Sequence, residues 1–69
     1  MRMSKKHDYG GMTTNERLYA AGLLEQFDAA ARTRNRNSIV DILMQVDVSQ
    51  TDAIAIAEKI LIKPERYGY

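Results

Sequence analysis

Apolar side chains recur at helical spacing in three segments of this chain. The first stripe falls at positions i, i+3, i+4, i+7 and i+11: Ala20, Leu23, Leu24, Phe27 and Ala31. This spacing is one face of an α-helix and predicts a helix over residues 15–34, whose start is marked by the capping-box pattern Thr13-x-x-Glu16. Gly22 lies inside the stripe. We expect either a glycine tolerated in the helix, at a cost of up to ~1 kcal/mol, or a close approach of another helix over its bare surface.

Two shorter stripes follow the first. They are formed by Ile39, Ile42, Leu43 and Val46, and by Ala53, Ile56, Ala57 and Ile60. These stripes predict helices over residues 36–46 and 50–62. Asn35 and Ser49 are favourable N-cap residues directly before them. Pro64 is expected to end the last helix, because the residue before a proline is disfavoured in helical geometry.

The three predicted helices define an all-α fold, a compact three-helix domain over residues 12–69 with short connections. The apolar spacing is closer to 3.6 than to 2, so we expect no β-strand. The residues after Pro64 are too few for another element. We expect Tyr67 to fold back over the core, because a small bundle needs its aromatic side chains.

The N-terminal segment differs from the rest of the chain. Residues 1–11 show no apolar periodicity and end in two consecutive glycines, so we expect a flexible tail. Three basic residues accompany Asp8 there, whereas the body is close to neutral. Met12 follows directly, so residues 1–11 are either a native tail or sequence translated upstream of an original start at Met12.

Composition narrows the class of protein. The 69 residues suffice for one domain, and 45% hydrophobic with 28% charged residues is too apolar for intrinsic disorder. Cysteine is absent, which excludes disulfides, thiolate metal sites and thiol nucleophiles. No apolar run approaches the ~20 residues that span a bilayer, and no secretory signal precedes the body. We therefore expect a cytoplasmic protein that does not associate with membranes.

Candidate catalytic groups are few. His7 is the only histidine and lies in the predicted tail, so we expect no metal site, and no cofactor-binding motif is present. Glu25 and Asp28 are three residues apart, but Asp28 is also four residues before Arg32, which indicates an ordinary solvated helix face. We expect that the protein is not an enzyme.

Several apolar residues exceed what one stripe per helix needs. They are Val40, Met44, Ile54, Leu61 and Ile62. Surplus apolar surface on a small domain is typical of an interface, and the terminal Tyr69 is a further candidate anchor. We expect a homodimer, or a subunit that docks on a larger protein. The alternative is a monomer with scattered exposed apolar residues.

The segment around the first helix junction is basic. Its three arginines could bind phosphates: Arg32, Arg34 and Arg36. The alternative function is therefore that of a nucleic-acid-associated regulator. The alternative explanation is structural, since basic side chains favour the negative C-terminal end of a helix. The predicted third helix also argues against a DNA-reading role, because its outward positions are more acidic than basic.

Several short patterns resemble a group of short uncharacterised bacterial helical proteins. They are Asn15-Glu16-Arg17-Leu18, Ala21-Gly22-Leu23, Phe27-Asp28-Ala29, and Ile60-Leu61 with Pro64 and Tyr67-Gly68-Tyr69. The resemblance covers residues 12–69. It implies a compact cytoplasmic protein and no catalytic or binding residue, since no activity is established for the group.

Overall fold

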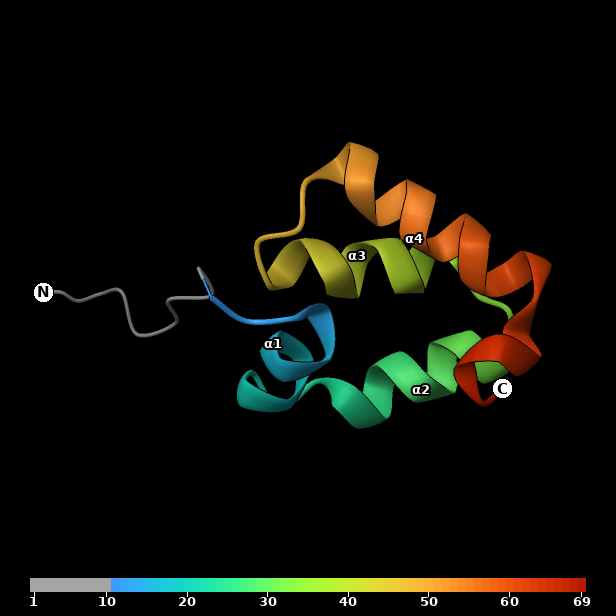
Figure 1. Ribbon diagram of the computed structural model, residues 1–69, viewed down its shortest axis with the longest axis horizontal. Helices are drawn as coiled ribbons and strands as arrows, with labels where there is room; N and C mark the ends of the chain where they lie inside the picture. Colours follow the sequence, from blue (N-terminus) through green and yellow to red (C-terminus); the bar gives the residue numbers. More distant parts are fainter. Residues whose placement is uncertain (1–10) are drawn as a thin grey trace, which may run out of the picture.

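The computed structural model describes residues 11–69, which contain helices and no strand. The elements are α1 (Thr14–Ala20), α2 (Leu24–Arg32), α3 (Arg36–Gln45), α4 (Gln50–Ile62) and the 3-10 helix η1 (Pro64–Tyr67) (Figure 1). The all-α prediction is confirmed. The predicted tail, apart from Gly11, and His7 lie outside the described residues.

The predicted helix over residues 15–34 is wrong, because the chain breaks at Gly22 into α1 and α2. Gly22 adopts φ +73°, a left-handed conformation that favours glycine. Its amide donates to Tyr19 O at 3.1 Å, and the Leu23 amide donates to Leu18 O at 2.9 Å. This pair of hydrogen bonds is a Schellman motif, which ends a helix.

Neither sequence interpretation of Gly22 is correct. A Cβ built on this residue would meet no atom within 4 Å, so no second helix approaches it closely. The glycine is required by its backbone conformation.

The predicted α3 and α4 are confirmed to within one residue. The Asn35 side chain accepts a hydrogen bond from the Ser38 amide, and the Ser49 side chain accepts one from the Asp52 amide, each at 3.2 Å. Both N-caps therefore act as predicted. The last α-helix ends before Pro64, again as predicted.

Schellman motifs also end α2 and α3, without glycine. Arg34 and Asp47 adopt φ values of 57° and 65°. The amides that follow each helix donate back into its last turn, as the Asn35 amide does to Ala30 O at 2.9 Å and the Val48 amide to Leu43 O at 3.2 Å. The chain therefore turns by the same device three times between α1 and α4.

The C-terminal segment forms an element that sequence analysis did not predict. Residues Pro64–Tyr67 are η1, and Gly68 ends it with φ +86°. The Tyr69 amide then donates to Pro64 O at 3.0 Å. This compact turn brings the C-terminus beside the end of α2 (Figure 1).

The core lies between the helices, and α3 packs on both α2 and α4. Its fully buried larger side chains are Leu18, Ile39, Leu43 and Val46. Each such burial stabilises the fold by about 1.5–3 kcal/mol. Ala53 and Ala57 present small side chains on the buried side of α4.

A polar contact connects α1 to the end of α3. The Arg17 guanidinium donates from Nη1 to Val46 O at 3.2 Å and to Asp47 O at 3.5 Å. These carbonyls follow the last turn of α3, where the helix dipole is negative. The contact spans about thirty residues of sequence and has no local sequence signal.

Candidate functional site

Neighbouring flanks of α3 and α4 form a surface that we call the outer face. Its apolar members are Val40 and Met44 from α3, and Ile54 and Leu61 from α4. Val40 and Met44 are four residues apart, and Ile54 and Leu61 are seven apart. Each pair therefore lies on one side of its helix.

An ion pair joins the two flanks of the outer face. Arg36 Nη2 lies 3.3 Å from Glu58 Oε2. Arg36 is one turn before Val40, and Glu58 is one turn after Ile54. The ion pair therefore places Val40 and Ile54 on the same side of the helix pair. Its side chains are 46% and 57% exposed, so it contributes at most about 1 kcal/mol.

Solvent exposure divides the predicted interface residues into two groups. Met44 is 44% exposed and Ile62 is 76% exposed, whereas Ile54 is partly buried. Val40 and Leu61 are also partly buried and pack against the core. Ile62 is four residues after Glu58 and borders the outer face. The exposed apolar surface of this region therefore centres on Met44 and Ile62, with a partial contribution from Ile54.

Tyr69 packs inward on α2. Its hydroxyl donates to Asp28 Oδ1, and its side chain packs against the core. Burial and this hydrogen bond raise the pKa of Tyr69 to about 12. Tyr67, which we expected to fold back, is 45% exposed. The packing role that we predicted for Tyr67 therefore belongs to Tyr69.

Each arginine of the predicted phosphate-binding corner has a contact within the fold. Arg32 lies over the Tyr69 ring, with Cζ 6.0 Å from the centroid. Arg34 Nη1 donates to Ala31 O and Arg32 O, each at 3.0 Å. Arg36 pairs with Glu58. Within residues 11–69, Asp28 and Arg32 form no ion pair, and Asp28 accepts a hydrogen bond from Tyr69.

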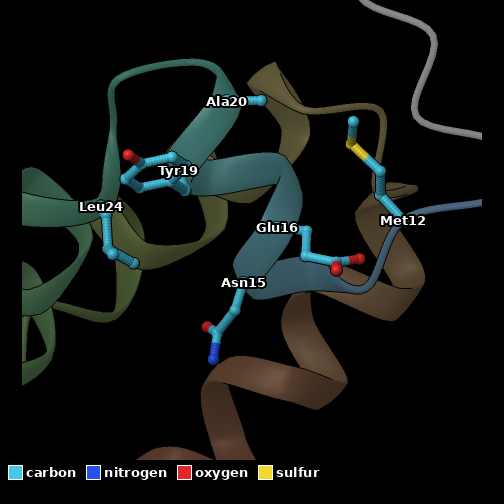
Figure 2. A pocket seen from close by; sticks show the side chains of 6 residues that line it. All are labelled: Met12, Asn15, Glu16, Tyr19, Ala20 and Leu24. Atoms are coloured by element: carbon cyan, nitrogen blue, oxygen red, sulfur yellow. The ribbon is translucent and has the colours of Figure 1, made fainter.

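A shallow hollow on α1 exposes apolar side chains that sequence analysis missed. Figure 2 shows its lining, which comes from α1, the preceding Met12 and Leu24 at the start of α2. The hollow has a volume of about 470 Å³. Tyr19 is its most exposed large apolar side chain, at 75%. This hollow was not predicted from the sequence because the break at Gly22, which separates α1 from α2, was not predicted either.

The described residues offer no arrangement for metal chemistry or membrane crossing. Among residues 11–69, no group of three His, Cys, Asp or Glu side chains could hold a metal ion. None of the helices in this range is long and apolar enough to cross a membrane.

Comparison with known proteins adds no assignment to this geometry. The chain matches no protein-family model, no curated protein and no solved structure.

Proposed function

We propose that the chain is a small non-enzymatic, cytoplasmic protein–protein interaction module that self-associates through the outer face of α3 and α4. The observation that carries this proposal is the exposure of Met44 on a face that continues over Ile54 and ends near Ile62. Apolar side chains gathered on one side of a small domain are typical of an interface.

The charges on the outer face favour a second copy as the partner. The face carries the ion pair of Arg36 and Glu58, and both side chains are about half exposed. In a twofold dimer the same patch meets itself. Arg36 of one copy could then face Glu58 of the other, so the meeting faces would not repel each other.

A concentration series followed by amide NMR tests this function. We expect shifts that grow with protein concentration and are confined to α3 and α4. Met44→Lys should weaken association by at least roughly tenfold, because it places a charge in an apolar contact. Self-association should persist in high salt, since apolar contact rather than charge drives it.

Tyr19→Lys is the matched control for this experiment. Tyr19 is a large exposed side chain on α1, outside the outer face. Its substitution adds the same charge as Met44→Lys and should leave association unchanged. Equal loss in both variants would reject the outer face as the contact surface, and spectra independent of concentration would reject self-association.

A further inference from the structure

A groove lies between the start of α1 and α4 and reaches η1. Its volume is about 730 Å³, within the roughly 300–1,000 Å³ that is common for small-molecule sites. Side chains from four helical elements line it, among them Asn15 of α1, Phe27 of α2, Lys59 of α4 and Arg66 of η1. None of the outer-face residues takes part, so this groove is separate from the proposed contact surface.

The charged side chains that line the groove are positive. They are Lys59 and Arg66, and no Asp or Glu side chain is part of the lining. Within residues 11–69, neither cation forms a side-chain hydrogen bond or an ion pair. The arginines of the helix junction, by contrast, all have partners. Two free cations in one groove raise the local concentration of anions.

Aromatic rings supply part of the apolar lining of the groove, together with Ile56 and Ile60. Phe27 is buried, at 5% exposure, while Tyr67 is 45% exposed. Tyr69 completes the set and is anchored through its hydrogen bond to Asp28. Aromatic and cationic side chains in one lining suit a ligand that is flat and apolar at one end and negative at the other.

We propose that this groove binds a small organic anion, namely a ring or other flat apolar body that carries a phosphate or carboxylate group. The anionic group lies between Lys59 and Arg66, and the ring packs on Tyr67. The inference is independent of the proposed self-association.

The surroundings favour a small anion over a long polyanion. The next hollow along α4 has a volume of about 520 Å³ and shares Lys59 with the groove. Its lining includes Asp47 and Asp52 as well as Arg17, so the excess of positive charge in the groove does not continue along α4. A long polyanion would gain no further net attraction in this direction, whereas a small ligand needs none.

Titration of the full chain with 1-naphthyl phosphate, followed by amide NMR, tests the proposal. We expect saturable shifts centred on Asn15, Lys59 and Arg66. Inorganic phosphate, which lacks the ring, and 1-naphthol, which lacks the charge, should each bind at least roughly tenfold more weakly.

Three single substitutions locate the site. Lys59→Gln and Arg66→Gln should each lower the affinity for 1-naphthyl phosphate roughly tenfold, because each removes a charged partner. Lys63→Gln is the control, since it removes the same charge from an exposed residue that does not line the groove. Self-association should be unchanged in all three variants, which separates this test from that of the outer face.

Three results would overturn the proposal. One is the absence of saturable shifts at millimolar 1-naphthyl phosphate. Another is equal binding of 1-naphthol, which would show that the cations contribute nothing. The third is an equal loss of affinity in Lys63→Gln, which would indicate attraction by net charge alone.

Discussion

The two helix pairs of this protein are built by the same turn but present different surfaces. α1 and α2 are joined through Gly22, and α3 and α4 through Asp47, both in the left-handed conformation. The α3–α4 pair carries the apolar outer face, joined by the Arg36–Glu58 ion pair. The α1–α2 pair instead contributes uncharged side chains, such as Asn15 and Phe27, to the groove whose cations lie on α4 and η1. The difference shows that one compact core can support two surfaces of distinct chemistry.

The largest expected effect comes from the core that both pairs share. Leu43 of α3 is fully buried. Leu43→Ala should lower the free energy of unfolding by about 2–5 kcal/mol, because it leaves a cavity. Urea denaturation followed by circular dichroism measures this loss. A change below about 1 kcal/mol would show that α3 is not the central element.

Replacing Gly22 changes the free energy of unfolding in opposite directions for a broken and for a continuous helix. Gly22→Ala should destabilise the protein by about 1–2 kcal/mol, because alanine is strained at φ +73°. If residues 15–34 were one continuous helix, the same change would stabilise it by up to ~1 kcal/mol. Thermal unfolding of the two proteins distinguishes these outcomes.

The hydrogen bond between Tyr69 and Asp28 connects the C-terminal residue to α2. Tyr69→Phe removes this bond and should cost about 1 kcal/mol at neutral pH. Because the pKa of Tyr69 is raised from 10.0 to about 12, its contribution is complete below pH 10 and is lost as pH rises towards 12.

Unfolding free energies measured from neutral to alkaline pH check this linkage. The difference between the original chain and Tyr69→Phe should shrink as the pH rises through that window. A difference that stays constant would contradict the proposed role of the hydroxyl.

The smallest stability effect is expected at the ion pair of the α3–α4 pair. Arg36→Gln should lower the free energy of unfolding by no more than about 0.5 kcal/mol, because both partners are solvated. A loss above about 1 kcal/mol, measured by urea denaturation, would show that the ion pair holds α3 against α4.

The arginine corner also tests the alternative function in nucleic-acid binding. We expect that the chain does not bind duplex DNA in a salt-dependent way. The reason is that Arg32, Arg34 and Arg36 already have contacts within the fold. Fluorescence anisotropy at two salt concentrations measures this. Salt-dependent binding that is lost when all three arginines are replaced by glutamine would favour the alternative.

The ends of α3 and α4 could be predicted from the sequence, because residues directly at each end determine them. Asn35 and Ser49 cap the helices with their own side chains, and Pro64 stops α4 directly. The break between α1 and α2 was missed because Leu23 and Leu24 continue the apolar stripe past Gly22. An apolar residue directly after a glycine is also typical of a Schellman motif, and that signal was available.

The candidate sites depend on contacts that no local pattern reveals. Tyr69 reaches Asp28 across 41 residues, and Arg36 reaches Glu58 across 22. Of the five surplus apolar residues, Met44 and Ile62 are exposed, whereas Val40, Ile54 and Leu61 are partly buried, and their role in an interface stays a prediction. The groove was missed because its cations, Lys59 and Arg66, lie on different elements, one of them η1, which sequence analysis did not predict.

Sedimentation of the unmodified chain over a wide concentration range tests whether the outer face mediates self-association. We expect a reversible shift from monomer to dimer as concentration rises, and no such shift for Met44→Lys at the same concentrations. A single monomeric species at every concentration, or an unchanged dimer in Met44→Lys, would contradict self-association through the outer face of α3 and α4.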